Sequence, residues 1–406
     1  MAFWPTLRPN LFVIAWADSP IGTHSDRLSI SLRIMAPKSS RRDRFRVGRL
    51  ALVASGLLVL SLFAAWSVAS SSASSSKGFI AYVTNAEDEG KAPGVGSVFP
   101  INLTDNKPGA PIKVGRGAGT NDLVVTADGK TGYSTNEGTN TVVPITLATG
   151  RLGKAIGVGS EPVAIAFVPR SGERWVWVAN YGGKTVSTVN VVTGKVGQTI
   201  SVPEVGPNTI AFTPDGRTCY VANWGTEGAP GSTVTPIQVT HGGAGGRVLP
   251  SISVGLHPNW VAIGQDGRTA YVANKGSNSI TPIDVPTNTV GTPIPVPGPP
   301  IEMEISPDGR TAYVAIAGSA PEIDEVMPLD LATTPVKVGS AIKLKPGSQP
   351  HWIAFTPDGQ TAYVVGNGNS TVTPIGVATG RAGRPIKVTT DPKADLLAIS
   401  IVQAQN

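Results

Sequence analysis

A tetrapeptide related to Tyr-Val-Ala-Asn recurs seven times in this chain and constrains its fold more than any other feature. Successive copies start 51, 44, 43, 51, 42 and 50 residues apart. A period of this size marks a repeat architecture, in which neighbouring units stack into one body, so the 406 residues need not divide into several domains. The copies begin at Tyr82, Tyr133, Trp177, Tyr220, Tyr271, Tyr313 and Tyr363.

The same order of strands and turns surrounds each copy. A lead-in strand such as 209–212 is followed by an Asp-Gly turn such as Asp215-Gly216, then by the tetrapeptide strand, a third strand and an outer strand. Asp-Gly between apolar strands is typical of a tight hairpin, because Gly readily adopts a positive φ. The sequence therefore predicts an all-β fold, a seven-bladed β-propeller of four-stranded antiparallel blades.

Most third strands contain a proline, as in the segment 232–237 with Pro236. Proline lacks the N–H that a sheet ladder needs, so we expect each of these prolines to face a gap or a bulge. The single cysteine, Cys219, replaces an alanine of other copies and is predicted to be a small buried hydrophobic residue.

The two ends of the repeat region complement each other. The first copy begins at Phe79 without a lead-in strand, whereas Asp395–Ser400 matches a lead-in strand and has no tetrapeptide after it. We therefore expect this C-terminal segment to join the first blade and close the ring, which removes an open sheet edge.

The residues before the repeats are typical of a targeting segment. Five arginines between 41 and 49 precede an apolar run, Leu50–Ala69, which a Ser- and Ala-rich stretch follows. This order predicts a signal peptide or a membrane anchor over 35–69, a Ser-rich linker over 70–78 and the propeller over 79–406. Residues 1–34 remain unassigned, since Met35 would start a signal of ordinary length. We expect an exported protein, either secreted or tethered through Leu50–Ala69.

The basic character of the chain belongs to this leader. Residues 1–76 hold nine of the 33 Lys and Arg residues and three of the 27 acidic residues, so 24 of each remain in the repeats. A neutral propeller gives no reason to expect a nucleic-acid partner.

The tetrapeptides and the Pro-Asp-Gly turns together resemble the YVTN-type β-propeller repeat proteins, which include surface-layer-associated members. The resemblance covers about residues 79–401. The tetrapeptide asparagine is missing in the last two copies, where Ile316 and Gly366 replace it, and Ser171-Gly172 replaces the Asp-Gly turn of the third copy. The resemblance implies the fold but no activity, because propellers have many unrelated functions.

The most conspicuous residues are predicted to be structural. The turn aspartates recur because each blade needs the same hairpin, and the tetrapeptide asparagines are expected to satisfy backbone groups in the loop that follows. The sequence contains no Gly-x-Ser-x-Gly motif, phosphate-binding loop or metal-spaced Cys/His cluster. No cofactor is therefore expected, and whether a metal binds stays open.

The residues that begin the lead-in strands are better candidates for a site. In a propeller these strands are innermost, so their first residues surround one mouth of the central channel. When the copies are aligned on the Asp-Gly turns, the residue type at the start of the lead-in strand differs from blade to blade, although the repeated fold does not require it to differ. The polar side chains there, together with two tryptophans, could hold a small polar ligand or a cation. The candidate ligand-binding residues are Asn121, Asp122, Asn208, Asn259, Trp260, Glu302, His351, Trp352 and Asp395.

Three copies also carry longer loops, at 86–95, at 225–231 with 241–246, and at 317–325. Variable loops on a rigid scaffold are typical of binding surfaces. We expect a monomeric binding or scaffold protein of the cell envelope that presents these loops to a protein or glycan partner, without catalysis. The alternative is a lactonase-like hydrolase that uses the polar residues of the channel mouth, with or without a divalent metal.

Overall fold

The computed structural model describes residues 78–86, 94–318, 323–391 and 394–404. The predicted leader and most of the linker lie outside the described residues. Within the described part of the chain, no helix has the length and apolarity needed to cross a membrane.

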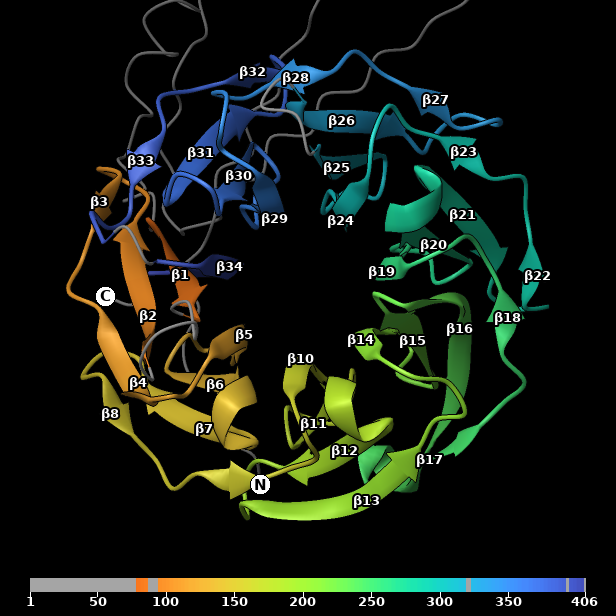
Figure 1. Cartoon of the computed structure of the whole chain (residues 1–406). Helices are drawn as coiled ribbons and strands as arrows, with labels where there is room; N and C mark the ends of the chain where they lie inside the picture. The colour runs from red at the N-terminus through yellow and green to blue at the C-terminus, as the bar shows by residue number, and fades with distance from the viewer. Residues whose placement is uncertain (1–77, 87–93, 319–322, 392–393, 405–406) are drawn as a thin grey trace, which may run out of the picture. The chain divides into compact units, whose positions relative to one another are not determined.

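The described residues form seven antiparallel sheets in a ring (Figure 1). This arrangement confirms the predicted seven-bladed β-propeller. We number the blades from 1, which begins at Phe79, to 7, and each inner strand contacts the inner strands of the two adjacent blades. The inner strands, in blade order, are β34 (Leu396–Gln403), β5 (Thr120–Val125), β10 (Pro162–Phe167), β14 (Pro207–Phe212), β19 (Pro258–Ile263), β24 (Pro300–Ile305) and β29 (Pro350–Phe355).

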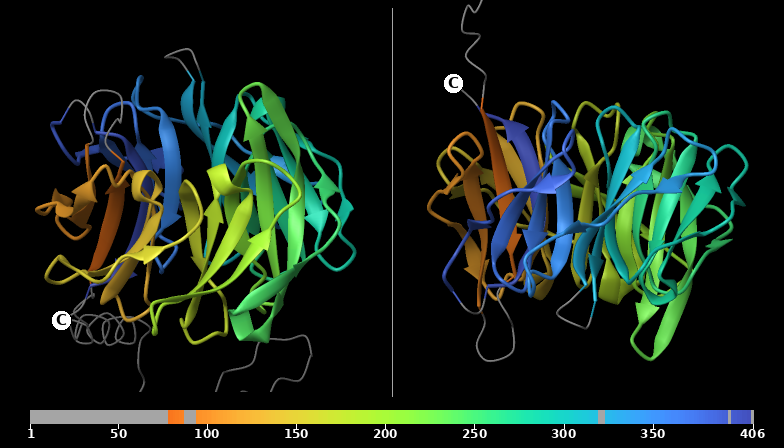
Figure 2. Two further views of the ribbon diagram at one scale, coloured as in Figure 1. Left: turned by 60° about the horizontal axis from the view of Figure 1, so that its bottom comes forward. Right: turned by 90° about the horizontal axis from the view of Figure 1, so that it is seen from above.

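The two middle strands of each blade are uninterrupted, and the connections between strands gather at the two faces of the ring (Figure 2). The second strands are β1 (Phe79–Asn85), β6 (Thr131–Asn136), β11 (Trp175–Asn180), β15 (Thr218–Thr226), β20 (Thr269–Asn274), β25 (Thr311–Ala317) and β30 (Thr361–Gly366). The third strands are β2 (Val95–Asn102), β7 (Thr141–Thr146), β12 (Thr185–Asn190), β16 (Ala229–Thr240), β21 (Ser279–Asp284), β26 (Asp324–Asp330) and β31 (Thr371–Gly376). Short 3-10 helices follow some strands: η1 (Glu137–Thr139), η2 (Tyr181–Gly183), η3 (His241–Gly243) and η4 (Lys275–Ser277).

The outer edge of six blades is split into two short strands, and the third-strand proline lies at the split. In blade 2, β8 pairs with Ile145 and Thr146, β9 pairs with Thr141 and Val142, and Pro144 faces the gap. Blade 3 has Thr188 at this position, and its outer strand β13 (Lys195–Ser201) is continuous. The predicted gap is thus confirmed. The split pairs are β3 (Lys107–Pro108) and β4 (Ile112–Arg116), β8 (Arg151–Leu152) and β9 (Ile156–Gly157), β17 (Gly245–Val248) and β18 (Ile252–Ser253), β22 (Thr289–Val290) and β23 (Ile294–Pro295), β27 (Lys337–Val338) and β28 (Ile342–Lys343), and β32 (Arg381–Ala382) and β33 (Ile386–Lys387).

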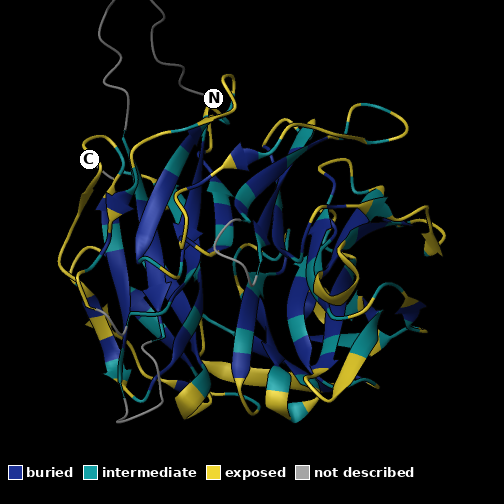
Figure 3. Ribbon diagram, turned by 45° about the horizontal axis from the view of Figure 1, so that its top comes forward, coloured by how far each residue is buried: buried dark blue, intermediate teal, exposed yellow. Residues whose placement is uncertain are grey.

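The hydrophobic core is divided among the seven interfaces between adjacent blades. Each interface has its own cluster, such as the one between blades 3 and 4 that contains Trp177, Ile210 and the fully buried Cys219. Burial is concentrated in the inner and middle strands, and exposure in the connections and outer strands (Figure 3). Cys219 is therefore a small buried residue, as predicted, and burial raises the pKa of its thiol.

The recurrent polar residues have structural roles, as predicted. In the turn of blade 4, Asp215 Oδ1 accepts hydrogen bonds from Thr213 Oγ1 at 2.6 Å and from the amide of Arg217 at 3.0 Å. Gly216 there has a φ of 69°. The tetrapeptide asparagines bond both backbone and side chains. Asn274 Nδ2 donates to the backbone oxygen of Ser279 at 3.2 Å, just after the loop that follows it, whereas Asn223 Nδ2 donates to hydroxyl groups of the third strand at 3.0 Å and 2.8 Å.

The C-terminal strand closes the ring. β34 pairs antiparallel with β1, with Tyr82 opposite Ser400 and Ile80 opposite Val402. The predicted segment Asp395–Ser400 therefore joins blade 1, and the strand continues to Gln403. Since β34 also contacts the inner strands of blades 2 and 7, the last residues of the chain hold three blades together.

Candidate functional site

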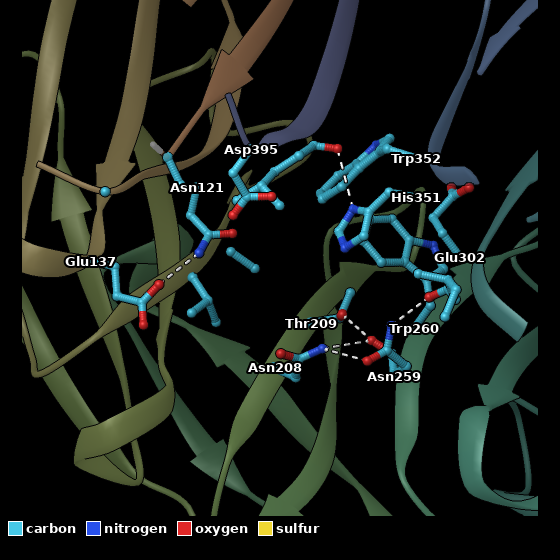
Figure 4. A pocket seen from close by; sticks show the side chains of 16 residues that line it. Asn121, Glu137, Asn208, Thr209, Asn259, Trp260, Glu302, His351, Trp352 and Asp395 are labelled. Carbon is cyan, nitrogen blue, oxygen red and sulfur yellow. Dashed lines mark hydrogen bonds between the residues drawn. The ribbon is translucent and has the colours of Figure 1, made fainter. Parts of the chain in front are cut away.

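A cavity of about 430 Å³ opens where the inner strands begin, at one mouth of the central channel (Figure 4). It takes side chains from every blade, and eight of the nine predicted site residues line it. Its walls are Ala86, Gly119, Asn121, Glu137, Val163, Ala164, Asn208, Thr209, Asn259, Trp260, Ile301, Glu302, His351, Trp352, Asp395 and Leu397. A second cavity, of about 580 Å³, is lined by residues of blades 1 and 7 and includes none of the predicted site residues.

A β-bulge at the start of each inner strand explains why varied side chains gather here. In blade 3, Pro162 lies opposite Asn180 and Ala164 lies opposite Ala179, so Val163 has no partner in the ladder. A bulge redirects a side chain away from the sheet. The residue in the bulge, which we call the mouth residue, can therefore vary without breaking a blade. The mouth residues of blades 1 to 7 are Leu397, Asn121, Val163, Asn208, Asn259, Ile301 and His351.

The mouth residue of blade 1 differs from the predicted alignment. Ile399 pairs with Val83 as Ile353 pairs with Val364 in blade 7, which makes Leu397 equivalent to His351 and moves Asp395 two residues earlier. The shift arose because no Asp-Gly turn follows β34 to fix the alignment. Asp395 still lines the cavity, where its Oδ1 accepts a hydrogen bond from Asn367 Nδ2.

Asp122 is the one predicted site residue that does not line the cavity. Its side chain is buried between blades 2 and 3, where Oδ2 accepts the amide of Ile165 at 2.9 Å and Oδ1 accepts the amide of Leu123 at 2.7 Å. Burial raises its pKa to about 7, although both hydrogen bonds act in the opposite direction. Both carboxylate oxygens are engaged by backbone, so Asp122 fastens two blades together.

Glu302 occupies the same strand position in blade 6. Its Oε2 accepts the amide of Ile353 in blade 7 at 3.1 Å, which reproduces the bond between Asp122 and Ile165. Its other oxygen, Oε1, is buried without a hydrogen-bond partner, and only 1% of the residue is exposed. Glu302 thus combines an inter-blade contact with a spare acceptor.

Glu304 follows Glu302 on the same face of β24 and was not among the predicted residues. Burial, together with the neighbouring Glu304, raises the pKa of Glu302 well above its ordinary value, and burial raises the pKa of Glu304 to about 8. The sequence did contain a signal, because four blades carry alanine at the equivalent position. The equivalent residues are Ser400, Val124, Ala166, Ala211, Ala262 and Ala354.

The asparagines of the mouth use their amide N–H groups on the protein itself. Asn208 Nδ2 donates to the backbone oxygen of Asn259 at 2.9 Å, and Asn259 Nδ2 donates to the backbone oxygen of Ile301. Asn121 Nδ2 donates to Glu137 Oε2 at 2.9 Å. Figure 4 shows these bonds, and the side-chain oxygens of Asn121 and Asn208 accept no hydrogen bond from the described residues. Glu137, on η1, was another residue that the alignment of inner strands could not reveal.

Aromatic and imidazole rings complete the wall. Trp260 and Trp352 come from the blades on either side of blade 6 and meet edge to face, with ring centroids 4.5 Å apart. The Nδ1 atom of His351 lies 3.3 Å from the backbone oxygen of Leu397. Burial lowers the pKa of His351, and Lys275 acts in the same direction, which favours a neutral imidazole at pH 7.

The lining is acidic. Glu137, Glu302 and Asp395 belong to it, and no Lys or Arg does. Throughout the described ranges, no group of three or more His, Cys, Asp or Glu residues has the arrangement to hold a metal ion.

Two of the longer loops are described in full, and the one at 225–231 opens at the mouth face. It connects β15 to β16 next to Asn223, which lies opposite Pro207 at the start of β14, and its green hairpin extends beyond its neighbours in Figure 2. The loop at 241–246 connects the third and outer strands and opens at the other face. In the loop of blade 6, Asp324 is buried and accepts the amides of Ser348 and Gln349, so this acid is structural.

Comparison with known proteins identifies the fold only. No family model and no curated protein matches the chain. Among solved structures, it resembles the periplasmic gluconolactonase of Pseudomonas aeruginosa, with a TM-score of 0.64 and 16% identity over 80% of this chain and 99% of that one. It also resembles a proposed 6-phosphogluconolactonase of Bacteroides fragilis, with a TM-score of 0.63 and 18% identity over 81% and 99% of the two chains.

A third similar structure has a different function. The hydrazine synthase of Kuenenia stuttgartiensis has a TM-score of 0.57 and 20% identity over 70% of this chain and 86% of that one. Proteins this different share an architecture without sharing an activity. The YVTN-type grouping therefore stays an expectation from the sequence, whereas the propeller fold is shown.

Proposed function

We propose that this chain is an exported binding propeller of the cell envelope, which presents its mouth face to a protein or glycan partner and catalyses no reaction. The observation that carries the proposal is that the polar cavity and the β15–β16 hairpin, two features that do not repeat from blade to blade, lie on the same face. Export rests on the leader sequence, and the YVTN-type resemblance favours the cell surface.

A row of aromatic side chains on the same face supports a binding role. Trp224 lies at the base of the β15–β16 hairpin, 4.3 Å from His257 and 6.2 Å from Tyr181 between ring centroids. The three residues come from consecutive blades and are partly exposed. Aromatic side chains are frequent anchors of binding interfaces, since they offer a large rigid contact area.

The lactonase alternative is the second candidate, and the names of two structural neighbours favour it. His351, favoured as neutral, could act as a general base there. A phosphorylated sugar lactone fits this lining poorly, because the three acidic side chains of the lining would repel the phosphate group of the ligand. The alternative therefore predicts turnover of an unphosphorylated lactone.

Two variants of the tagged full chain, expressed in its own envelope, test the proposal. The first shortens the hairpin at 225–231, and the second shortens the loop at 241–246 on the opposite face as a matched control. We expect the first to reduce capture of the cross-linked partner at least 10-fold and the second to leave capture unchanged. Equal capture by both variants would refute the binding face, and gluconolactone turnover that is lost in His351→Ala would favour the hydrolase.

A further inference from the structure

The mouth cavity has side-chain oxygens that accept no hydrogen bond from the described residues. Asn121, Asn208 and Asn259 each donate at least one side-chain N–H to a protein oxygen, and Asn259 Oδ1 in turn accepts from Asn208. The side-chain oxygens of Asn121 and Asn208 and Oε1 of Glu302 are left as acceptors. A ligand that pairs with these oxygens must supply donors.

The charge of the lining narrows the ligand further. The acidic side chains of Glu302 and Asp395 border the cavity, and no Lys or Arg is among its lining residues. A neutral polyol could satisfy the acceptors, but it would bring no positive charge to this acidic lining. A donor that also carries positive charge satisfies both conditions, because charge-assisted hydrogen bonds are about twice as strong as neutral ones.

One oxygen of Glu302 indicates where a positively charged group of the ligand would bind. Glu302 Oε1 is buried and unpartnered, although Oε2 of the same carboxylate is bonded to the amide of Ile353. A buried acceptor without a partner is costly. Burial and the adjacent Glu304 also raise the pKa of Glu302, because both disfavour its charged form. A cation at this oxygen would supply the missing partner and favour the charged carboxylate.

The surroundings favour an organic cation over a metal ion. Trp260 and Trp352 offer aromatic surface beside Glu302, and a cation near an aromatic ring gains attraction from the ring quadrupole. The volume of about 430 Å³ is that of a small-molecule site. No third acidic, His or Cys ligand completes a metal shell around Glu302 and Glu304 within the described residues.

We propose that the mouth cavity binds a small organic amine in its protonated form, with the ammonium group donating to Glu302 Oε1 and the carbon skeleton against Trp260 and Trp352. Further N–H or O–H groups of the ligand donate to the oxygens of Asn121 and Asn208. This site goes beyond the envelope-binding function and does not depend on a macromolecular partner.

Calorimetric titration of the full chain with matched pairs of ligands tests the proposal. Glucosamine and glucose differ by an ammonium and a hydroxyl group, and so do cyclohexylamine and cyclohexanol. We expect at least one amine to bind 10-fold or more tightly than its neutral counterpart at pH 7. Equal affinities within both pairs, or no binding of either amine, would overturn the proposal.

A variant series locates the ammonium group. Glu302→Gln keeps a carbonyl oxygen for the amide of Ile353 but removes the charge, so we expect amine affinity to fall at least 10-fold while the thermal transition is retained. Asp105→Asn removes an exposed carboxylate of blade 1 and is expected to leave the affinity unchanged. Equal loss in both variants would show that only the net charge matters and would overturn the assignment. Binding of Ca²⁺ or Mg²⁺ that Glu302→Gln abolishes, without amine preference, would replace the amine by a metal ion.

Discussion

Blades 2 and 6 place a carboxylate at the same point of the inner strand and use it differently. Asp122 and Glu302 each accept the backbone amide of the next blade, at Ile165 and Ile353. The second oxygen of Asp122 is bonded to Leu123, whereas that of Glu302 has no partner. The shorter side chain keeps both oxygens close to the backbone, and the longer one leaves an oxygen unused.

The residues on either side of the two carboxylates also differ, being small around Asp122 and aromatic around Glu302. Blade 2 is flanked at this level by Ala398 and Ala164, and blade 6 by Trp260 and Trp352. The acid in blade 2 is thus a fastener in a close-packed ring, while the acid in blade 6 faces aromatic surface and a cavity. An acidic residue at a repeated position is structural when all its oxygens are satisfied, and it becomes a candidate ligand group where one oxygen is left over.

Replacing each carboxylate by its isosteric amide should distinguish the two roles, with the largest expected effect on stability. Asp122→Asn must turn its NH₂ group towards one of two amide donors, so we expect the free energy of unfolding to fall by about 1–3 kcal/mol. Glu302→Gln can give its oxygen to Ile353 and its NH₂ group to the unpartnered side, so we expect a change of no more than about 0.5 kcal/mol. Urea denaturation at pH 8 measures the free energy of unfolding of both variants. Equal decreases in the two variants would show that the two carboxylates have the same structural role.

The pH dependence of the free energy of unfolding should reveal the raised pKa of Glu304, the second acidic residue of blade 6. An acid whose pKa is higher in the folded state than in the unfolded chain destabilises the fold as pH rises through that interval. For Glu304 the interval runs from 4.5 to about 8. Between pH 6.5 and 8.5, we expect the wild-type free energy of unfolding to fall by about 1–2 kcal/mol more than that of Glu304→Gln.

This range also separates Glu304 from His351, whose lowered pKa acts only below its ordinary value of 6.5. Asp122 contributes a fall of the same sign in both proteins, so it cancels in the difference. Parallel curves for wild type and Glu304→Gln would contradict the raised pKa of Glu304.

The tryptophan pair should give the smallest effect. A double-mutant cycle of Trp260→Ala and Trp352→Ala should yield a coupling of about 0.5–1.5 kcal/mol, the usual strength of an edge-to-face pair. Ala164 and Ala398 at the flanks of blade 2 have no comparable contact. A coupling indistinguishable from zero would mean that the rings do not form one surface.

Sequence alone predicted most of the fold because a repeat tests each inference several times. The turn at Asp215, the gap at Pro144 and the closing strand that begins at Leu396 all follow from local chemistry applied to every copy. The mouth position could be found in the same way. The register of Asp395 could not, since β34 lacks the turn that aligns the other inner strands.

The roles of individual acids depended on three-dimensional contacts. Asp122 and Glu302 look alike in the alignment, and only the hydrogen bonds of their second oxygens distinguish them. Glu304 occupies a position that is alanine in four other blades. The alignment of mouth residues did not detect this difference, because Glu304 lies further along the strand. The targeting role of Leu50–Ala69 and the monomeric state stay predictions from the sequence.

A crystal structure of the full chain grown with glucosamine tests the distinction between the two blades most directly. We expect the amino nitrogen within hydrogen-bond distance of the Glu302 carboxylate, with Asp122 still bonded only to backbone. A sugar that places a hydroxyl at Glu302 and its nitrogen in solvent, or a cavity that remains empty, would contradict this distinction.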